Sequence, residues 1–211
     1  MNVIAIVSSK GGSGKTTIAQ CLAVEALRQG MAAAIIDTDP QQSSSDWGDQ
    51  RTAARIEAPA VIALGSKRLA TVLADLRNRG AGMVIIDTPP HSAPVINAAL
   101  DVSTASIIVT RPNPMDIRAL EATWSIVSLM KKPTAAVFTQ TPPGNRARAF
   151  GLARGRLDEL DIPYCPTPIS YTLSFPYAQA EALAVQEREP TGKARAEIAE
   201  VWGWLKRKSI F

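Results

Sequence analysis

The sequence has 211 residues, of which 46% are hydrophobic and 20% charged, and its formal net charge is +4. This length and composition are typical of one globular domain and argue against an intrinsically disordered chain. No apolar run approaches the roughly 18 residues that a membrane-spanning helix needs. Because Met1 and Asn2 lead directly into an apolar run, we expect no signal peptide.

The two cysteines, Cys21 and Cys165, lie far apart and form no C-x-x-C pair. We therefore predict that they are small core residues of a cytoplasmic, bacterial protein rather than disulfide partners. The net positive charge and a pI of about 9.3 permit contact with nucleic acid or anionic lipid.

A phosphate-binding loop is predicted near the start of the chain. The apolar run Val3–Val7 is followed by Ser8-Ser9-Lys10-Gly11-Gly12-Ser13-Gly14-Lys15-Thr16-Thr17 and then by a helical pattern to about Arg28. Strand, glycine-rich loop and helix form the context that binds phosphates, because backbone N–H groups and the positive end of the helix converge on an anion. The residues predicted to bind nucleotide are Lys10, Gly11, Gly12, Ser13, Gly14, Lys15, Thr16 and Thr17.

The loop departs from the general P-loop, which has glycine where this chain has Ser9. The pattern Lys-Gly-Gly-x-Gly-Lys-Thr-Thr resembles the deviant Walker A box of the ParA/MinD family. This resemblance implies that ATP is the nucleotide and that Lys15 contacts its β- and γ-phosphates. It also implies that Lys10 crosses the interface of an ATP-bound homodimer and contacts the nucleotide of the other subunit, so Lys10 and Lys15 are both expected to be catalytic.

Two further boxes place carboxylates after apolar runs. Asp37-Thr38-Asp39-Pro40-Gln41 follows Ala33–Ile36, and Asp87-Thr88-Pro89-Pro90 follows Met83–Ile86. By resemblance, Asp39 is needed for hydrolysis, whereas Asp37 and Asp87 act together with the Thr16 hydroxyl to hold Mg²⁺. His91, the only histidine, follows the second box and is expected to be an exposed loop residue.

The remaining pattern predicts an α/β fold. Strands are expected at the apolar runs 3–7, 33–36, 83–86, 105–109 and 135–138, and more weakly at 61–64. Helices are expected at 67–79, 116–130, 146–160 and 191–208, with Gly30 and Gly80 at helix ends. Alternating strands and helices predict a doubly wound, mostly parallel twisted sheet flanked by helices. We expect one P-loop ATPase domain over residues 1–211, without an N-terminal helix-turn-helix domain.

A proline-containing loop, Thr110-Arg111-Pro112-Asn113-Pro114-Met115-Asp116, follows the strand at 105–109. Its two prolines predict that no helix begins before Asp116, which would cap the helix that follows. The family has a comparable loop near the base and the dimer contact, but the resemblance assigns no partner to Arg111.

Arginine and lysine are concentrated in the C-terminal half of the chain. ParA-type proteins bind DNA without sequence preference, so the resemblance predicts a phosphate-contacting surface here, although its residues vary within the family. The candidate DNA-binding residues are Arg146, Arg148, Arg154, Arg156, Lys193, Arg195, Lys206, Arg207 and Lys208. Arg146 has the alternative of serving the nucleotide pocket.

Taken together, the resemblance implies a short ParA-type ATPase for plasmid or chromosome partition or cargo positioning, stimulated by a ParB-like partner and released from the nucleoid by hydrolysis. Three alternatives stay open. The C-terminal segment 202–211, basic and rich in tryptophan, permits a MinD-like membrane switch, although its narrow apolar stripe favours docking on the sheet. The second is a metabolic relative, such as an iron–sulfur carrier or carboxylating enzyme, and the third is a helper in conjugative transfer.

Overall fold

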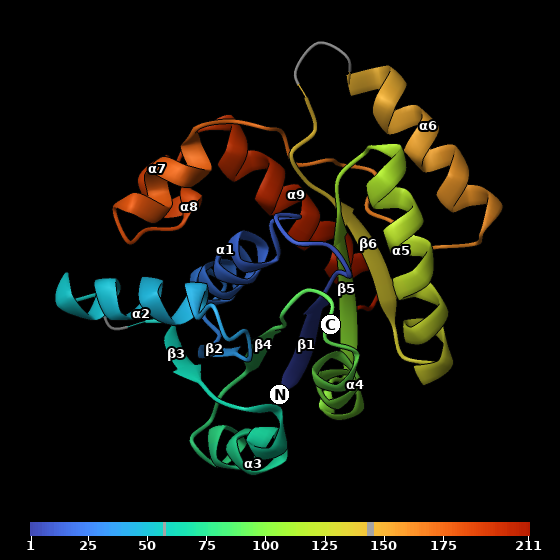
Figure 1. Cartoon of the computed structure of the whole chain (residues 1–211). Helices are drawn as coiled ribbons and strands as arrows, with labels where there is room; N and C mark the ends of the chain where they lie inside the picture. Colours follow the sequence, from blue (N-terminus) through green and yellow to red (C-terminus); the bar gives the residue numbers. More distant parts are fainter. Residues whose placement is uncertain (57, 143–145) are drawn as a thin grey trace.

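The computed structural model describes residues 1–56, 58–142 and 146–211 (Figure 1). In this part of the chain six parallel strands form one sheet with the order β3-β2-β4-β1-β5-β6. The strands are β1 (Asn2–Val7), β2 (Ala33–Asp37), β3 (Ala60–Ala63), β4 (Met83–Asp87), β5 (Ala105–Thr110) and β6 (Thr134–Phe138). Every predicted strand is present, including the weakly predicted one, which forms the edge strand β3.

Helices cover both faces of the sheet (Figure 1). They are α1 (Lys15–Arg28), α2 (Ser43–Ala53), α3 (Leu69–Asn78), α4 (Ala93–Val102), α5 (Pro114–Val127), α6 (Arg146–Glu159), α7 (Ser174–Ala180), α8 (Val185–Arg188) and α9 (Lys193–Arg207), with 3₁₀ turns at Ser66–Arg68 and Ser128–Met130. The predicted α/β doubly wound architecture is confirmed.

The two helix layers follow from the alternation of side chains along each strand. In β1, Ile4 and Ile6 join the core formed with α1 and α9, whereas Val3, Ala5 and Val7 join the core formed with α3, α4, α5 and α6. Because both faces are covered, all strands except the edge strand β3 are almost entirely buried, which explains why they occur as continuous apolar runs. Among the described residues, no helix combines the length and hydropathy needed to cross a bilayer.

Helix ends agree with the predictions except at α5. Gly30 and Gly80 follow α1 and α3 with φ of 78° and 83°, as expected for glycines that end helices. The prediction that the helix begins at Asp116 is wrong. It begins at Pro114, and the Asn113 side chain caps it by accepting a hydrogen bond of 3.0 Å from the Asp116 backbone N–H. Proline fits the first helical position because its φ is already helical and its missing N–H would have no partner there.

A buried guanidinium ties α2 to the C-terminal segment. Arg51 is 2% exposed, and its two terminal nitrogens donate to the Glu187 carboxylate at 2.8 and 2.9 Å. The same side chain donates to the carbonyls of Ala58 and Ala182 and lies 4.5 Å from the ring centre of Trp47. Arg51 therefore supplies donors to two backbone carbonyls and balances the charge of the half-buried Glu187 carboxylate.

We expect Arg51→Ala to lower the free energy of unfolding by about 3 kcal/mol, because two carbonyls would lose a donor and the Glu187 carboxylate would keep only the N–H of Ala184. Chemical denaturation measures this change. Arg79→Ala is the control, since Arg79 pairs with Asp75 at 2.8 Å on the exposed surface and should change the same free energy by less than about 1 kcal/mol. Equal effects of the two substitutions would contradict the structural role of Arg51.

Candidate nucleotide-binding site

The glycine-rich loop lines a cleft of about 410 Å³ at the carboxyl end of β1, together with Asp39, Gln41, Ser43, Pro90 and Gln179. Gly12 and Gly14 adopt φ of 69° and 90°, a region that side chains disfavour, so the loop needs glycine at both positions. No side chain caps α1, because Gly14 stands at its N-cap. The N-terminal N–H groups of α1 are therefore available to an anion in the cleft.

The segment that follows β6 and the helix α5 hold the loop by hydrogen bonds. Thr139 donates to the Ser13 carbonyl at 2.6 Å, and Gln140 donates to the Gly12 carbonyl at 2.8 Å. Ser9, which replaces the usual glycine, donates to the Ala119 carbonyl at 2.7 Å. These contacts fix a loop whose glycines would otherwise leave it mobile.

Lys15 lies within the cleft, and its side chain is only 7% exposed. Burial lowers the pKa of its ammonium, whereas the negative charges of Asp87 and Asp39 act in the opposite direction. A buried ammonium in a cleft lined by glycine N–H groups is a suitable partner for phosphate oxygens.

Asp37 and Asp87 are paired residues at the ends of the neighbouring strands β2 and β4. Both are buried, at 2% and 1% exposure. Asp37 accepts hydrogen bonds from the backbone and hydroxyl of Ser45 at 2.9 and 3.1 Å. Asp87 accepts from the hydroxyls of Thr16 at 2.7 Å and Ser44 at 2.8 Å. The sheet thus brings together the three residues predicted to hold Mg²⁺, namely Thr16, Asp37 and Asp87.

One oxygen of Asp87 is buried without a partner. Both hydroxyls bind Oδ2, and Oδ1 has no hydrogen bond in the described structure. Burial raises the pKa of this carboxyl to about 6, despite the hydrogen bonds from Thr16 and Ser44. A buried carboxylate oxygen without a donor, beside a second carboxylate and a threonine hydroxyl, fits a hard divalent cation or its water shell.

Asp39 lies at the mouth of the cleft and is less buried than Asp37. Its carboxylate accepts from the Gln41 backbone N–H at 2.9 Å, and its own N–H donates to Asp37 at 3.0 Å. This places Asp39 beside the phosphate loop, where it was predicted. His91 is an exposed residue of the turn after β4, as expected.

Lys10 does not lie in the phosphate cleft with Lys15. Among the described residues that line the cleft, Lys15 is present and Lys10 is absent. The Lys10 ammonium instead lies 2.5 Å from the carboxylate of Asp116, which also accepts from Arg111 and Asn113. Burial opposes ionisation of Asp116, but the hydrogen bonds from Arg111, Lys10 and Asn113 outweigh it and lower the pKa of this carboxyl. Asp116, predicted as a helix cap, is thus the anion between two cations.

A second pocket of about 210 Å³ shares Gly14, Thr17 and Gln179 with the phosphate cleft. Its other walls come from the residues just after β6, the segment before α7 and the start of α7, which contributes Phe175 and Pro176. Gln179 reaches from α7 to α1, where it donates to Thr17 at 3.3 Å and to Gln20 at 2.9 Å. The pocket therefore extends the phosphate cleft with apolar side chains suited to a nucleoside base.

Sequence reasoning missed Ser44, Ser45 and Gln179. The three consecutive serines at 43–45, one residue beyond the box at 37–41, were the available signal for the first two, since serine is common where helices begin. Gln179 lies 162 residues from Thr17 along the chain. Only the tertiary fold brings it to the loop.

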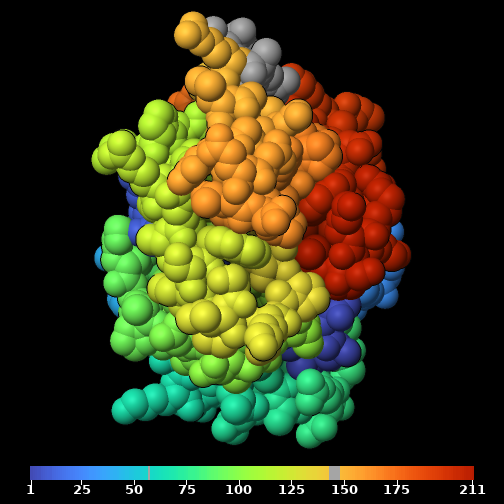
Figure 2. All heavy atoms as spheres, turned by 90° about the vertical axis from the view of Figure 1, so that its right-hand side faces the viewer, coloured from blue at the N-terminus to red at the C-terminus, as the bar shows by residue number. Residues whose placement is uncertain are grey.

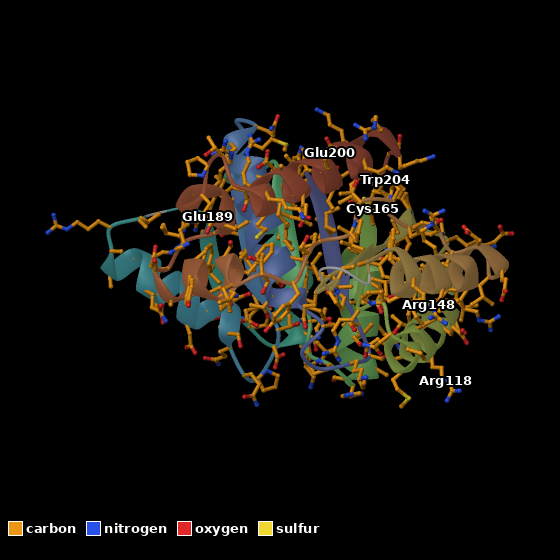
Figure 3. The ribbon with its side chains drawn as sticks, turned by 90° about the horizontal axis from the view of Figure 1, so that it is seen from above. Arg118, Arg148, Cys165, Glu189, Glu200 and Trp204 are labelled. Atoms are coloured by element: carbon orange, nitrogen blue, oxygen red, sulfur yellow. The ribbon has the colours of Figure 1, made fainter. Side chains whose placement is uncertain are left out.

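The predicted DNA-binding residues fall on two sides of the sheet. Figure 3 shows Arg148 on the side of α6 and α5, and Trp204 on the opposite side with α9. On the face seen in Figure 2, α6 lies between α5 and the C-terminal segment. The side chain of Arg146 lies outside the described residues.

Several of these cations already have partners. Arg156 pairs with Glu121 and Glu159, both at 2.7 Å, and Lys193 lies 3.8 Å from Glu197. Arg154 lies over the rings of Phe150 and Tyr164. Arg195 is half-buried, whereas the remaining candidates, Arg148, Lys206, Arg207 and Lys208, are exposed.

The C-terminal segment is docked on the protein. Trp202 and Ile210 are 5% and 6% exposed, and the ring of Phe211 lies 4.7 Å from that of Trp202. This confirms the expected docking of the apolar stripe onto the sheet.

Comparison with protein families gives a match over residues 4–120 to the CobQ/CobB/MinD/ParA nucleotide binding domain. The matched segment begins in β1 and ends in α5, so it contains the loop and both carboxylate boxes. The chain belongs to this family. It is a ParA/MinD-family nucleotide-binding protein.

Two curated relatives are similar in sequence. The Maintenance of carboxysome distribution protein A of Gloeobacter kilaueensis is 33% identical over 120 residues, which are 56% of this chain and 53% of that protein. Protein ParA of Rhizobium radiobacter is 25% identical over 183 residues, which are 80% of this chain and 78% of that protein.

Solved structures share the fold. The apo form of McdA from Cyanothece superposes with a TM-score of 0.78 at 16% identity and covers 97% of this chain and 99% of its own. The septum site-determining protein MinD of Pyrococcus horikoshii, complexed with Mg-ADP, gives a TM-score of 0.76 at 18% identity over 99% of this chain and 98% of its own.

We expect Asp87→Asn to stabilise the nucleotide-free protein at pH 7.5. Because burial raises the pKa of Asp87 to about 6, the folded state binds its proton more tightly than the unfolded state, and stability is lost as the pH rises from about 4 to above 6. The neutral amide removes this cost.

Thermal unfolding without Mg²⁺ measures the effect of Asp87→Asn, and the difference from the original protein should shrink as the pH falls toward 4. Asp75→Asn, at an exposed surface pair, is the control and should show no such pH-dependent gain. A variant that melts at or below the temperature of the original protein at pH 7.5 would refute the prediction.

Proposed function

We propose that the chain is a ParA-type positioning ATPase that works as an ATP-dependent homodimer. In this proposal, residues 11–17, including the Lys15 ammonium, bind the phosphates. Thr16, Asp37 and Asp87 hold Mg²⁺. Asp39, at the mouth of the same cleft, orients the water that attacks the terminal phosphate. The base of ATP occupies the adjoining pocket at Phe175 and Pro176.

The proposal of a dimer is supported mainly by the separate positions of Lys10 and Lys15. Lys15 lies within the cleft, whereas the Lys10 ammonium is outside it, paired with Asp116. A lysine side chain held on the outer side of the loop does not serve the phosphates of its own chain. In the proposed dimer, Lys10 contacts the nucleotide bound by a second copy, and Arg111 still balances the charge of Asp116 after Lys10 has moved away.

We further propose that the ATP-bound dimer holds DNA without sequence preference and that hydrolysis releases it. The support is the exposed cluster Lys206, Arg207 and Lys208 at the end of α9. Adjacent exposed cations attract phosphates and release counterions when they bind. Arg156 is a weaker candidate than the sequence indicated, because two carboxylates already balance it.

Positioning of a cargo is proposed from the relatives. One is named for the maintenance of carboxysome distribution and another is a ParA protein. A ParB-like partner protein would stimulate hydrolysis and connect the ATPase to its cargo, which is a plasmid, a chromosome or a protein assembly.

The membrane alternative is disfavoured by the docked C-terminal segment. A MinD-like membrane anchor needs exposed apolar residues, but Trp202, Ile210 and Phe211 pack against the protein core. An iron–sulfur carrier is disfavoured because Cys21 and Cys165 are both buried, at 2% and 0% exposure. DNA therefore remains the favoured partner.

The dimer is tested by comparing the two lysines. Lys15→Ala should abolish binding of ATP, because it removes the buried ammonium of the cleft. Lys10→Ala should keep ATP binding by the monomer and lose the dimer. Fluorescent ATP measures binding, and light scattering with a non-hydrolysable ATP analogue and Mg²⁺ measures mass. Undiminished dimerisation of Lys10→Ala would refute the proposal.

DNA binding is tested by reversing the exposed cluster. The triple variant that combines Lys206→Glu, Arg207→Glu and Lys208→Glu should weaken DNA binding at least about tenfold. In a plot of the logarithm of the DNA-binding constant against the logarithm of the salt concentration, the slope should become less steep by about one unit for each lost phosphate contact. Gel shifts with ATP and Mg²⁺ measure this. Arg156→Gln, whose charge is already balanced, is the matched control. If the triple variant shifts DNA as well as the original protein does, the end of α9 is not the DNA-binding surface.

A further inference from the structure

The first turn of α2 is bonded to both carboxylates of the proposed metal site. Ser44 Oγ donates to Asp87 Oδ2 at 2.8 Å, and Ser45 donates to Asp37 Oδ2 through its backbone and hydroxyl. Ser44 is fully buried and is separated from Asp87 by 43 residues along the chain. A serine outside the Walker boxes therefore contacts the carboxylate at the end of β4.

The hydrogen bonds on Asp87 are unevenly distributed between its oxygens. Thr16 and Ser44 both donate to Oδ2, at 2.7 and 2.8 Å, while the buried Oδ1 has no partner in the described structure. Two donors on one oxygen fix the rotation of the carboxylate and leave the other oxygen with its acceptor sites open. Oδ1 is the atom that remains for a cation or its water.

The Thr16 hydroxyl has two tasks at this site, because it donates to Asp87 and is also expected to turn an oxygen lone pair to Mg²⁺. Within the described residues, the hydroxyl of Ser44 makes one hydrogen bond, which it donates to Asp87. Ser44 is therefore the donor whose contribution is to hold Asp87.

We propose that Ser44 is a positioning residue that orients the Asp87 carboxylate for Mg²⁺. This inference rests on the proposed nucleotide and Mg²⁺ site and adds a residue that acts through Asp87 without touching the ion. Partners of metal-binding groups typically change metal affinity by about 10- to 100-fold when they are removed.

The position of Ser44 is fixed by the rest of α2. Arg51, further along the helix, is held by Glu187 of α8, and Trp47 between them is 3% exposed. Figure 1 shows α2 running from the end of β2 past the region of α7 and α8. Because both ends of the helix are bonded, the Ser44 hydroxyl is presented by a rigid element.

The test separates nucleotide binding from Mg²⁺ binding. A fluorescent ADP analogue is bound first in EDTA and then titrated with MgCl₂. For Ser44→Ala, we expect the affinity for the analogue in EDTA to stay within about twofold, and the Mg²⁺ concentration at half-saturation to rise about tenfold. Thr52→Ala, at an exposed site on the same helix, is the matched control and should leave both values unchanged.

Ser44→Thr keeps the hydroxyl and should retain most of the Mg²⁺ affinity. If Ser44→Ala binds Mg²⁺ like the original protein, or if the alanine and threonine variants weaken it equally, the role of the hydroxyl is refuted. If the original protein itself shows no effect of Mg²⁺ on nucleotide binding, the proposed metal site fails instead. Thermal unfolding of each variant confirms that the comparison is made on folded protein.

Discussion

The structure depends on a pair of carboxylates buried where two neighbouring parallel strands end. Asp37 and Asp87 are paired in register, and both are almost inaccessible to solvent. Two buried anions side by side are unfavourable without compensation. The chain supplies hydroxyl and backbone donors from the phosphate loop and from α2, but among the described residues it leaves Oδ1 of Asp87 without one. The folded protein thus retains an unsatisfied acceptor within the proposed Mg²⁺ site.

This compensation connects elements that are distant in sequence. The first turn of α2 donates to the carboxylates, and Arg51 near the end of the same helix is bound to Glu187. The segment after α6 supplies Gln179, which contacts α1 beside the loop. The phosphate cleft is therefore bounded by both halves of the chain, although the loop and the carboxylates all lie in the first half.

A third buried carboxylate, Asp116, lies beside Lys10. Asp116 is buried between Lys10 and Arg111, so one carboxylate balances two cations. The excess positive charge makes Lys10 the cation that a phosphate can attract, because Arg111 still balances Asp116 after the exchange. In the proposed dimer, the contact between Lys10 and Asp116 is therefore exchanged for one between Lys10 and the nucleotide of the other subunit.

The sequence by itself determined the sheet, the phosphate loop and the two carboxylate boxes. Buried parallel strands must be apolar throughout, and a loop that surrounds an anion needs glycines at positive φ, so both leave a local pattern. The tertiary structure decided the partners of Asp87, Asp116 and Arg156, because each is bonded to at least one residue on another element. The predicted start of α5 was wrong for a related reason, since a proline that excludes a helix interior is favourable at its first position. Short-range patterns record backbone geometry, whereas the pairing of charges and hydroxyls depends on which elements the fold brings together.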